Sequence, residues 1–303
     1  MIGETLAHLF LLFVLSPLLA GVIGKTKALF AGRVGAPVLQ PYYDLGKLFR
    51  KGMVFSETST WVFRAGPVVG MAVPVAASLL IPFGGLAAPI SFSGDLILFV
   101  YLFGLARFFT AAAALDTGSS FEGMGAAREM TFSCLAEPTV LFSLVVLVRL
   151  SGGLSLETML GPSLLRAWQA GAAPLALIVV SLFVVLLAEN SRIPFDDPNT
   201  HLELTMIHEV MVLDHSGPAF GMVLYGAAMK LFVLGALVER LALPWQSGSV
   251  LFDGLIFIAG MLFLAVLVGV VESVMARLRL VRVPQILIGT TLVSAFAMVL
   301  VLR

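Results

Sequence analysis

Eight long apolar runs alternate with shorter polar segments along the chain. A helix that crosses a bilayer needs about 20 mostly apolar residues, and each run approaches or reaches that length. We therefore predict eight transmembrane helices, at about residues 3–24, 66–84, 94–114, 131–150, 173–189, 217–241, 251–271 and 284–302. Because no repeat and no linker divides them, residues 1–303 are expected to form a single all-α integral membrane domain.

The composition agrees with a membrane protein and narrows its chemistry. The 303 residues are 59% hydrophobic and 12% charged, whereas a soluble domain is about 25% charged. The net charge of zero argues against a nucleic-acid partner. One cysteine, Cys134, permits neither an internal disulfide nor a cysteine-ligated iron–sulfur cluster. The segment Met1–Ala7 carries Glu4 and no basic residue, so no signal peptide is expected.

Basic residues are distributed unevenly between alternate connecting segments, which predicts the orientation in the cytoplasmic membrane. With the N-terminus outside, twelve basic residues would lie inside: Lys25, Lys27, Arg33, Lys47, Arg50, Lys51, Arg64, Arg128, Arg192, Arg277, Arg279 and Arg282. Four would lie outside: Arg149, Arg166, Arg240 and Arg303. This bias places both termini outside and residues 189–218 on the cytoplasmic side.

Residues 25–52 predict a turn followed by a short helix on the cytoplasmic face. Glycines and prolines punctuate the first half, and Tyr42–Lys51 could form the helix. Two interpretations stay open. The basic residues could simply anchor the chain at the membrane face, or the segment could form a docking surface or a cavity wall for a partner protein.

Ionisable residues inside the third and fourth predicted spans indicate a polar interior. Arg107 is a charge within a span, which usually faces a helix bundle or water. Glu129, Ser133 and Glu137 recur every four residues and share a helix face, with the two carboxylates about 12 Å apart along the axis. Pro138 should free the carbonyl of Cys134 beside them. A hydrated path fits this pattern, but a proline kink with acids paired to Arg128 or Arg107 fits it too.

A glycine-rich connection is expected between these two spans. Gly118, Gly123 and Gly125 predict a flexible loop that carries Asp116 and Glu122.

The segment Glu189–Pro218 concentrates the titratable groups of the chain. It holds six of the eighteen carboxylates and three of the four histidines, with Arg192 as its one base. Asp197 is expected to cap a helix with Pro198 at its first position, running to about His215 and ended by Gly217 and Pro218. His201, Thr205, His208 and His215 would lie near one face, with Glu203 and Asp214 on another.

Three acids on this expected helix have apolar neighbours. Burial among them raises the pKa of a carboxyl group toward neutrality, so Glu203, Glu209 and Asp214 could exchange protons as a relay. Asp196 and Asp197 could instead serve only as caps, and His201 could be a plain surface group. The histidine spacing matches no common zinc site.

Two further charges could join this segment. Lys230, within the sixth span, could pair with Asp214 or Glu209 or could itself carry a proton. Glu272 ends the seventh span and could reach the acidic segment. The basic residues that follow Glu272 are expected to be cytoplasmic-side anchors.

Three blocks together resemble one family. They are GRVGAPVLQPYYDLGKLF at 32–49, LDTGSSFEGMGAARE at 115–129 and AENSRIPFDDPNTHLELTMIHEVMVLDHSG at 188–217, with a weaker fourth, ESVMARLRL, at 272–280. The chain resembles the membrane subunit of respiratory complex I that joins the hydrophilic arm to the pumping arm. The third block is most similar to the branch found in energy-converting [NiFe]-hydrogenases of the formate-hydrogenlyase and Ech type.

The resemblance implies a subunit that binds no redox cofactor itself. Its expected partners are a hydrogenase-like large subunit, an iron–sulfur small subunit and antiporter-like membrane subunits, with the [NiFe] centre and the clusters on those partners. The implied proton or ion path comprises Glu129, Glu137, Glu189, Glu203, Glu209, Asp214, Lys230 and Glu272. The implied docking residues are Arg33, Gln40, Asp44, Lys47, Asp116, Glu122, Arg128, Arg192, Asp196, Asp197 and His201.

Three rival functions remain. A quinone-reducing complex I subunit would have the same fold and a lipid-soluble substrate. A secondary transporter acting alone would place its acids at a midplane site rather than at one membrane face. A membrane anchor with no role in translocation would use its acids only for assembly.

Overall fold

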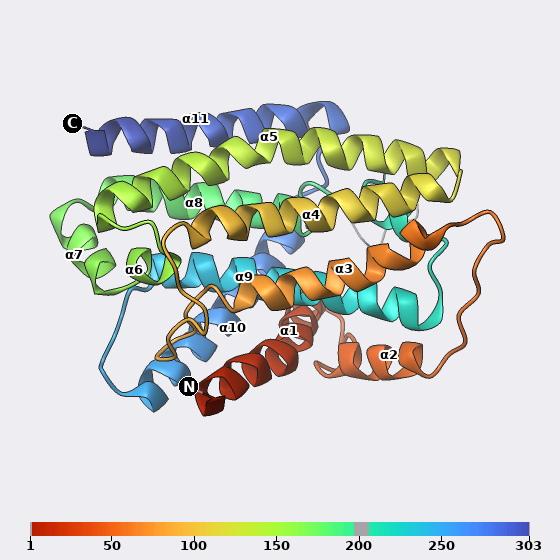
Figure 1. Ribbon diagram of the computed structural model, residues 1–303, viewed down its shortest axis with the longest axis horizontal. Helices are drawn as coiled ribbons and strands as arrows, with labels where there is room; N and C mark the ends of the chain where they lie inside the picture. Colours follow the sequence, from red (N-terminus) through yellow and green to blue (C-terminus); the bar gives the residue numbers. More distant parts are fainter. Residues whose placement is uncertain (1, 197–205, 303) are drawn as a thin grey trace.

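The eight predicted spans are confirmed as helices. A computed structural model describes residues 2–196 and 206–302. Eight helices in this part of the chain are long and apolar enough to cross a membrane: α1 (Ile2–Phe30), α3 (Trp61–Ser78), α4 (Asp95–Asp116), α5 (Ser120–Ser151), α8 (Ala172–Glu189), α9 (Gly217–Ala242), α10 (Val250–Val274) and α11 (Val283–Leu302). The described residues form no β-strand, and Figure 1 shows the helices as one bundle.

Both termini lie at one end of the bundle (Figure 1). We call this end the terminal face, and it also carries the short helices α6 (Leu156–Met159) and α7 (Pro162–Ala170). The opposite end carries α2 (Gln40–Phe49), and we call it the α2 face. The even number of spans explains why both termini share one face.

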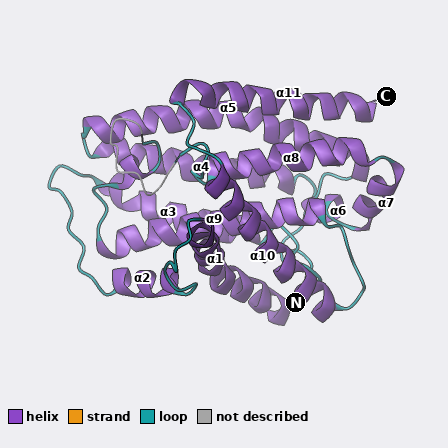
Figure 2. Ribbon diagram, turned by 180° about the vertical axis from the view of Figure 1, so that it is seen from behind, coloured by secondary structure: helices purple, strands orange, loops and turns teal. Residues whose placement is uncertain are grey.

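Helix α2 confirms the short helix predicted after the glycine- and proline-rich turn. It begins with Pro41 in its first turn, and none of its residues is buried. Its apolar and polar residues lie on different sides, as expected for a helix at a membrane surface. In both ribbon views α2 lies beside the long helices at the α2 face rather than among them (Figures 1 and 2).

Helix α9 lies in the centre, and small residues let its neighbours approach closely. A Cβ atom added at Gly226 of α9 would lie 2.6 Å from the carbonyl oxygen of Gly70 on α3. Likewise, a Cβ added at Gly66 of α3 would lie 2.8 Å from the Cβ of Ala113 on α4. Because membrane helices gain their contact energy from close packing, these glycines set the spacing of α3, α4 and α9.

Helices α1 and α10 pack together and cross the bundle at a slant, as both ribbon views show (Figures 1 and 2). Gly269 of α10 faces Thr26 of α1, where an added Cβ would lie 2.7 Å from the Thr26 Cβ. At the terminal face, a buried aromatic group fills the core, in which His8 stacks on Phe83 with ring centroids 3.8 Å apart.

Two predicted elements are wrong. Helix α5 begins at Ser120, so Gly123, Gly125 and Glu122 lie in a helix rather than in a flexible loop, and only residues 117–119 connect α4 to α5. The helix expected to run to about His215 is also absent from the described residues 206–216. That stretch contains only η1 (Glu209–Val212), a single 3₁₀ turn. The part of this prediction at 197–205, including Asp197 and Pro198, lies outside the described residues.

Glycine explains the first of these differences. A Cβ at Gly125 would lie 2.3 Å from Cγ1 of Val210 and 2.9 Å from the carbonyl oxygen of Ile207. The glycine therefore lets the 207–211 stretch rest directly on α5. Close packing, rather than chain flexibility, is the use of glycine at this position.

Candidate functional site

Four charged side chains from four helices meet inside the bundle. Nη1 of Arg107 on α4 lies 2.6 Å from Oε1 of Glu189 on α8, and Nζ of Lys230 on α9 lies 2.8 Å from Oε2 of the same carboxylate. The second terminal nitrogen of Arg107 contacts Oε1 of Glu137 on α5. We call these residues the quartet. Two cations and two anions leave it neutral overall.

The quartet lies deep in the membrane part of the protein. Arg107 and Lys230 are each twelve residues from the terminal-face end of their helices, which is about 18 Å. By the same measure Glu137 lies about 21 Å and Glu189 about 26 Å from that face. With a hydrocarbon core about 30 Å thick, Arg107, Lys230 and Glu137 fall well within the bilayer, and Glu189 meets them from the end of α8. Their mutual pairing is what makes this depth tolerable.

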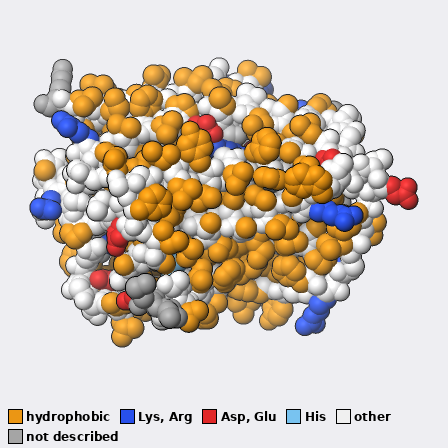
Figure 3. Space-filling model, viewed as in Figure 1, with side chains coloured by type: hydrophobic (Ala, Val, Ile, Leu, Met, Phe, Trp, Pro, Cys, Tyr) orange, Lys and Arg blue, Asp and Glu red, His pale blue; other side chains and the backbone are white. Residues whose placement is uncertain are grey.

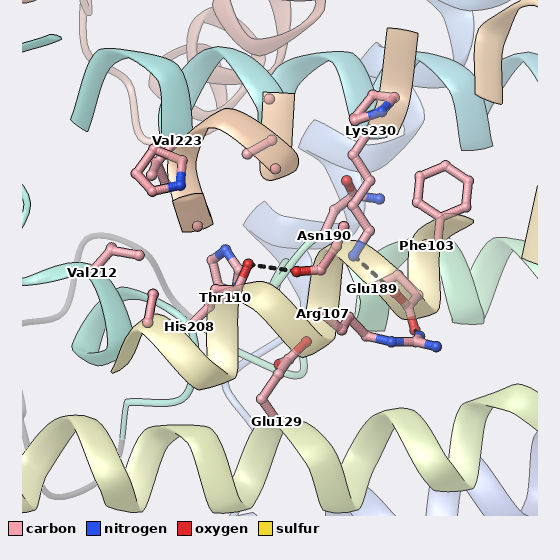
Figure 4. Close-up of a pocket in the computed structure, with 18 of the residues that line it drawn as sticks. Phe103, Arg107, Thr110, Glu129, Glu189, Asn190, His208, Val212, Val223 and Lys230 are labelled. Carbon is pink, nitrogen blue, oxygen red and sulfur yellow. Dashed lines mark hydrogen bonds and ion pairs between the residues drawn. The ribbon is translucent and has the colours of Figure 1, made fainter. Parts of the chain in front are cut away.

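A small cavity of about 80 Å³ opens beside the quartet. It is lined by Arg107, Glu189 and Lys230, together with Glu129 and His208. Figure 4 shows Lys230 reaching from α9 to Glu189, with Glu129 pointing toward the cavity from α5 below. Most of its wall is apolar, but the charged groups in it and the size of the cavity allow several water molecules to bind.

A larger cavity of about 520 Å³ lies toward the α2 face. Its walls come from α1, α2, α9 and two parts of the segment between α8 and α9, residues 190–196 and 208–215, and most of them are apolar. Charged groups line it at Asp44, Arg192, Asp196 and Glu209. The volume is in the range of small-molecule binding sites.

The two cavities share a wall. The residues that line both are Asn190, His208, Val212, His215, Val223 and Ala227. The quartet is therefore separated from the larger cavity by a single layer of side chains, two of which are histidines. This arrangement gives a polar route from the α2 face to the middle of the bundle.

Both histidines of the shared wall favour the neutral form. Burial lowers the pKa of His208, although the negative charge of Glu129 opposes this. Burial also lowers the pKa of His215 to about 4, and its ring stacks on Phe63 with centroids 4.0 Å apart. In both rings Nδ1 is buried and has no hydrogen-bond partner among the described residues. A neutral imidazole can both accept and donate a proton.

The backbone beside the shared wall is held by a buried acid. Oδ2 of Asp196 accepts hydrogen bonds of 3.1 Å from the amides of Ile207 and His208, and Oδ1 lies 2.8 Å from Nη2 of Arg277. Arg128 of α5 adds a 2.9 Å hydrogen bond to the carbonyl of Met206. These contacts replace the intrahelical bonds that the predicted helix would have made, which explains why residues 206–208 are not helical.

Glu272 binds two cations at the α2 face. Its carboxylate is buried between Lys27, at 2.8 Å, and Arg192, at 3.4 Å. It joins α1, α10 and the segment after α8 at one point. Because both cations hold it, Glu272 ties these three segments together at this face.

The structure brings together only part of the predicted path. Glu129, Glu189 and Lys230 line the smaller cavity, Glu137 completes the quartet, and Glu209 lines the larger cavity. The predicted pairing of Lys230 with Asp214 or Glu209 is wrong, because Lys230 binds Glu189.

Two other members of the predicted path stand apart from it. The expectation that Asp214 is buried is wrong, since its side chain is exposed. Glu203 lies outside the described residues.

The predicted docking residues also separate. Arg33, Asp44 and Lys47 are exposed at the α2 face, and Gln40 donates a 2.9 Å hydrogen bond to Asp44. Asp116 accepts from the amide and hydroxyl of Thr60 and so ties α4 to the start of α3.

Some of the docking predictions concern buried or undescribed residues. Glu122 is 1% exposed and accepts from the amide of Asp214, so its carboxylate is unavailable to a partner. Asp196 is also buried, and Arg128 and Arg192 are engaged as described above. Asp197 and His201 lie outside the described residues.

Sequence reasoning missed two features. It noted Arg107 as a charge within a span but did not connect it to Glu189, which is 82 residues away. The presence of two cations and two acids within predicted spans was the available signal. It also missed the terminal-face pair Glu239 and Arg240, both buried, where Arg240 donates to the carbonyls of Leu160 and Trp245.

Known proteins resemble this chain along nearly its whole length. A family model described as NADH dehydrogenase matches residues 4–303. Formate hydrogenlyase subunit 4 of Escherichia coli K12 is 32% identical over 282 residues, which cover 91% of this chain and 90% of that protein. Hydrogenase-4 component C of the same organism is 30% identical over 287 residues, covering 93% and 90%.

Two further likenesses are more distant. An NADH-quinone oxidoreductase subunit from Paraburkholderia phymatum is 27% identical over 257 residues, covering 82% of this chain and 71% of that protein. A chain in a solved structure of the membrane-bound sulfane sulfur reductase, an archaeal respiratory membrane complex, superimposes with a TM-score of 0.83 at 20% identity and 99% coverage of both chains. The latter shows that the fold is shared.

Proposed function

The chain belongs to the NADH dehydrogenase family, and on that premise we propose that it is the non-redox membrane subunit of an energy-converting hydrogenase complex. In this role it anchors the hydrophilic arm at the α2 face, which is the cytoplasmic side. It also links redox chemistry in that arm to the movement of protons or sodium ions. The [NiFe] centre and the iron–sulfur clusters belong to partner subunits.

The observation that carries this proposal is the quartet with its two cavities. A relay needs ionisable groups at the centre of the membrane and a polar connection to the partner side. The larger cavity, the shared wall and the smaller cavity supply that connection in order. The quartet supplies the groups, held at a depth where every unpaired charge is costly.

The chain's own residues suggest how coupling works. Glu189 is held between Arg107 and Lys230, so removing one cation would leave it badly compensated in a low-dielectric site. A charge change at the shared wall would alter the balance between these two ion pairs. Lys230 could then release a proton, or Glu137 take one up, on the far side of Arg107. The route thus runs through Glu129, His208 and the quartet and does not need Asp214.

The test is the ratio of ions moved to electrons transferred in the purified complex in liposomes. We expect Glu189→Gln and Lys230→Met to lower this ratio severalfold while the partner's redox centre still reduces protons. The control is Glu157→Gln, because Glu157 lies at the terminal face and lines neither of these cavities. An unchanged ratio in fully assembled Glu189→Gln and Lys230→Met complexes would refute the coupling role.

A second function is favoured by the larger cavity. Its apolar walls and few polar groups could accept a lipid-soluble quinone, and one set of relatives is named as subunits of NADH-quinone oxidoreductase. Leu224→Trp would narrow this cavity, since Leu224 lines it. Loss of quinone reductase activity in that variant, with hydrogen evolution absent from the wild type, would support the quinone function instead.

A further inference from the structure

One member of the quartet is open to the outside of the bundle. The side chain of Glu137 is 46% exposed, whereas those of Arg107 and Glu189 are each 9% exposed. The surface around it is formed by α4 and α5. Figure 3 shows acidic and basic atoms side by side within a mostly apolar surface over these helices. We call this surface the α4–α5 face.

The α4–α5 face is otherwise suited to a membrane. Its exposed residues include Met130, Leu141 and Val145 on α5 and Tyr101, Leu105 and Phe108 on α4. Cys134 is exposed one helical turn from Glu137. A half-exposed carboxylate in such surroundings is out of place next to lipid.

One carboxylate oxygen of Glu137 has no hydrogen-bond or ion-pair partner among the described residues. Oε1 of Glu137 is bound by Arg107, and no described group of this chain pairs with Oε2. Glu137 is about 21 Å from the terminal face, so lipid tails surround this depth and offer no hydrogen-bond donor. A charged oxygen in contact with hydrocarbon is strongly disfavoured, because nothing there replaces its hydration.

The net charge of the quartet indicates which kind of group should cover Glu137. The quartet is already neutral, so an added cation would create a net charge in the membrane. We propose that a transmembrane helix of a second membrane subunit covers the α4–α5 face and donates a neutral hydrogen bond to Oε2 of Glu137. Serine, threonine, asparagine or glutamine on that helix has the required chemistry. This inference rests on the proposed function, because it requires a multisubunit complex.

Cys134, the chain's one cysteine, reports on this surface without any mutation. We expect a membrane-permeant maleimide to label Cys134 at a measurable rate when the chain is expressed alone and solubilised in detergent at mildly alkaline pH, where the thiolate can form. In the purified complex, labelling should be at least tenfold slower, with full labelling after unfolding in dodecyl sulfate as the control. Equal labelling rates in the two preparations would overturn the proposal.

A benzophenone attached to Cys134 before reassembly of the complex identifies what covers the face. Photo-crosslinking to a transmembrane peptide of a second subunit, located by mass spectrometry, is the expected outcome. Crosslinking only to lipid or detergent would overturn the proposal.

Two substitutions of Glu137 isolate the hydrogen bond. Glu137→Gln and Glu137→Leu both remove the ion pair with Arg107, but only glutamine keeps an acceptor for the partner. We expect the second membrane subunit to stay bound in Glu137→Gln and to be lost severalfold more readily in detergent from Glu137→Leu. Equal retention in both variants contradicts the inference. If Cys134 labels freely in the complex while Glu137→Gln still lowers the ion-to-electron ratio, the docking surface is wrong and the coupling function stands.

Discussion

The hydroxyl of Tyr225 on α9 donates a 2.8 Å hydrogen bond to the carbonyl of Phe13, which is the carbonyl in α1 that Pro17 leaves without a helical donor. Tyr42 of α2 donates to the next carbonyl, that of Val14. Burial raises the pKa of Tyr42, so its hydroxyl remains a donor at neutral pH. Tyr225 therefore completes the hydrogen bonding of α1 at its proline, and Tyr42 adds a second contact one residue further on, beside the larger cavity that Pro17 lines.

This relationship predicts a specific rescue. Tyr225→Phe leaves the Phe13 carbonyl without a donor and should lower the free energy of unfolding by about 1–2 kcal/mol. In a Pro17→Ala background the new amide of residue 17 can bond to that carbonyl, so adding Tyr225→Phe should cost much less. A double-mutant cycle in detergent measures the coupling between the two changes.

The control for this cycle is Tyr101→Phe, because Tyr101 is 72% exposed on α4 and should be neutral in both backgrounds. Strictly additive effects of Pro17→Ala and Tyr225→Phe would show that the tyrosine does not replace the missing amide.

The lowered pKa of His215 predicts a loss of stability in acid. A base whose pKa is lower in the folded state binds protons more readily when unfolded, so stability falls as the pH drops below the unfolded value of about 6.5. The fall should continue to about pH 4, where folded His215 also becomes protonated. Above pH 6.5 this residue should contribute no pH dependence.

Thermal unfolding in detergent between pH 7.5 and 4.5 measures this effect. His215→Phe keeps a ring that can stack on Phe63 and removes the titration, so the variant should show a shallower decline of the melting temperature. A decline as steep as that of the wild type would assign the acid sensitivity to other groups, with His208 the next candidate.

Close packing at Gly125 predicts a position-specific glycine effect. Gly125→Ala places a Cβ against Val210 and the Ile207 carbonyl, so the 207–211 stretch must shift, at a cost of about 1–3 kcal/mol. Gly289→Ala on α11 meets nothing within 4 Å and should be neutral or slightly stabilising. Chemical denaturation of both variants in the same detergent gives the comparison. Equal stabilities for the two would refute the packing role.

The buried Asp196 predicts a local change rather than a global one. Asp196→Asn keeps an acceptor but loses the charge that binds Arg277 and the two amides, at a cost of about 2 kcal/mol. We expect faster hydrogen exchange of the Ile207 and His208 amides, with the spans unaffected. Asp44→Asn, on the exposed side of α2, is the control. Unaltered hydrogen exchange of the Ile207 amide in Asp196→Asn would show that Asp196 does not hold this part of the backbone in place.

Much of the fold could be predicted because a bilayer imposes its requirement on each span separately. A run of about 20 apolar residues is sufficient, so all eight helices and their order follow from local sequence. Helix α2 could be predicted as well, since the turn before it and the proline in its first turn are local signals. The identity of most charged residues in the site also followed, because charges within apolar runs are conspicuous.

One pairing was among the alternatives that the sequence offered, because the acids of α5 could pair with Arg107, and the contact between Arg107 and Glu137 confirms it. The pairing of Glu189 could not be predicted, since it depends on which helices are neighbours. Glu189 lies at the very end of α8 and meets Arg107 and Lys230 only because α4, α8 and α9 converge there. Over the described residues 206–215, the expected helix is absent for a similar reason. Asp197 and Pro198 are strong local start signals, but Asp196 and Arg128 bind the backbone at 206–208 from outside the segment.

The six side chains that line both cavities act as one partition between two compartments. A ligand in the larger cavity that moves these side chains would also change the shape and hydration of the smaller cavity. Binding of a bulky ligand in the larger cavity and protonation of a group at the smaller cavity would therefore favour different rotamers of the same side chains. The coupling that we propose would therefore need no long-range rearrangement of helices, because the two cavities are separated by a single layer of side chains.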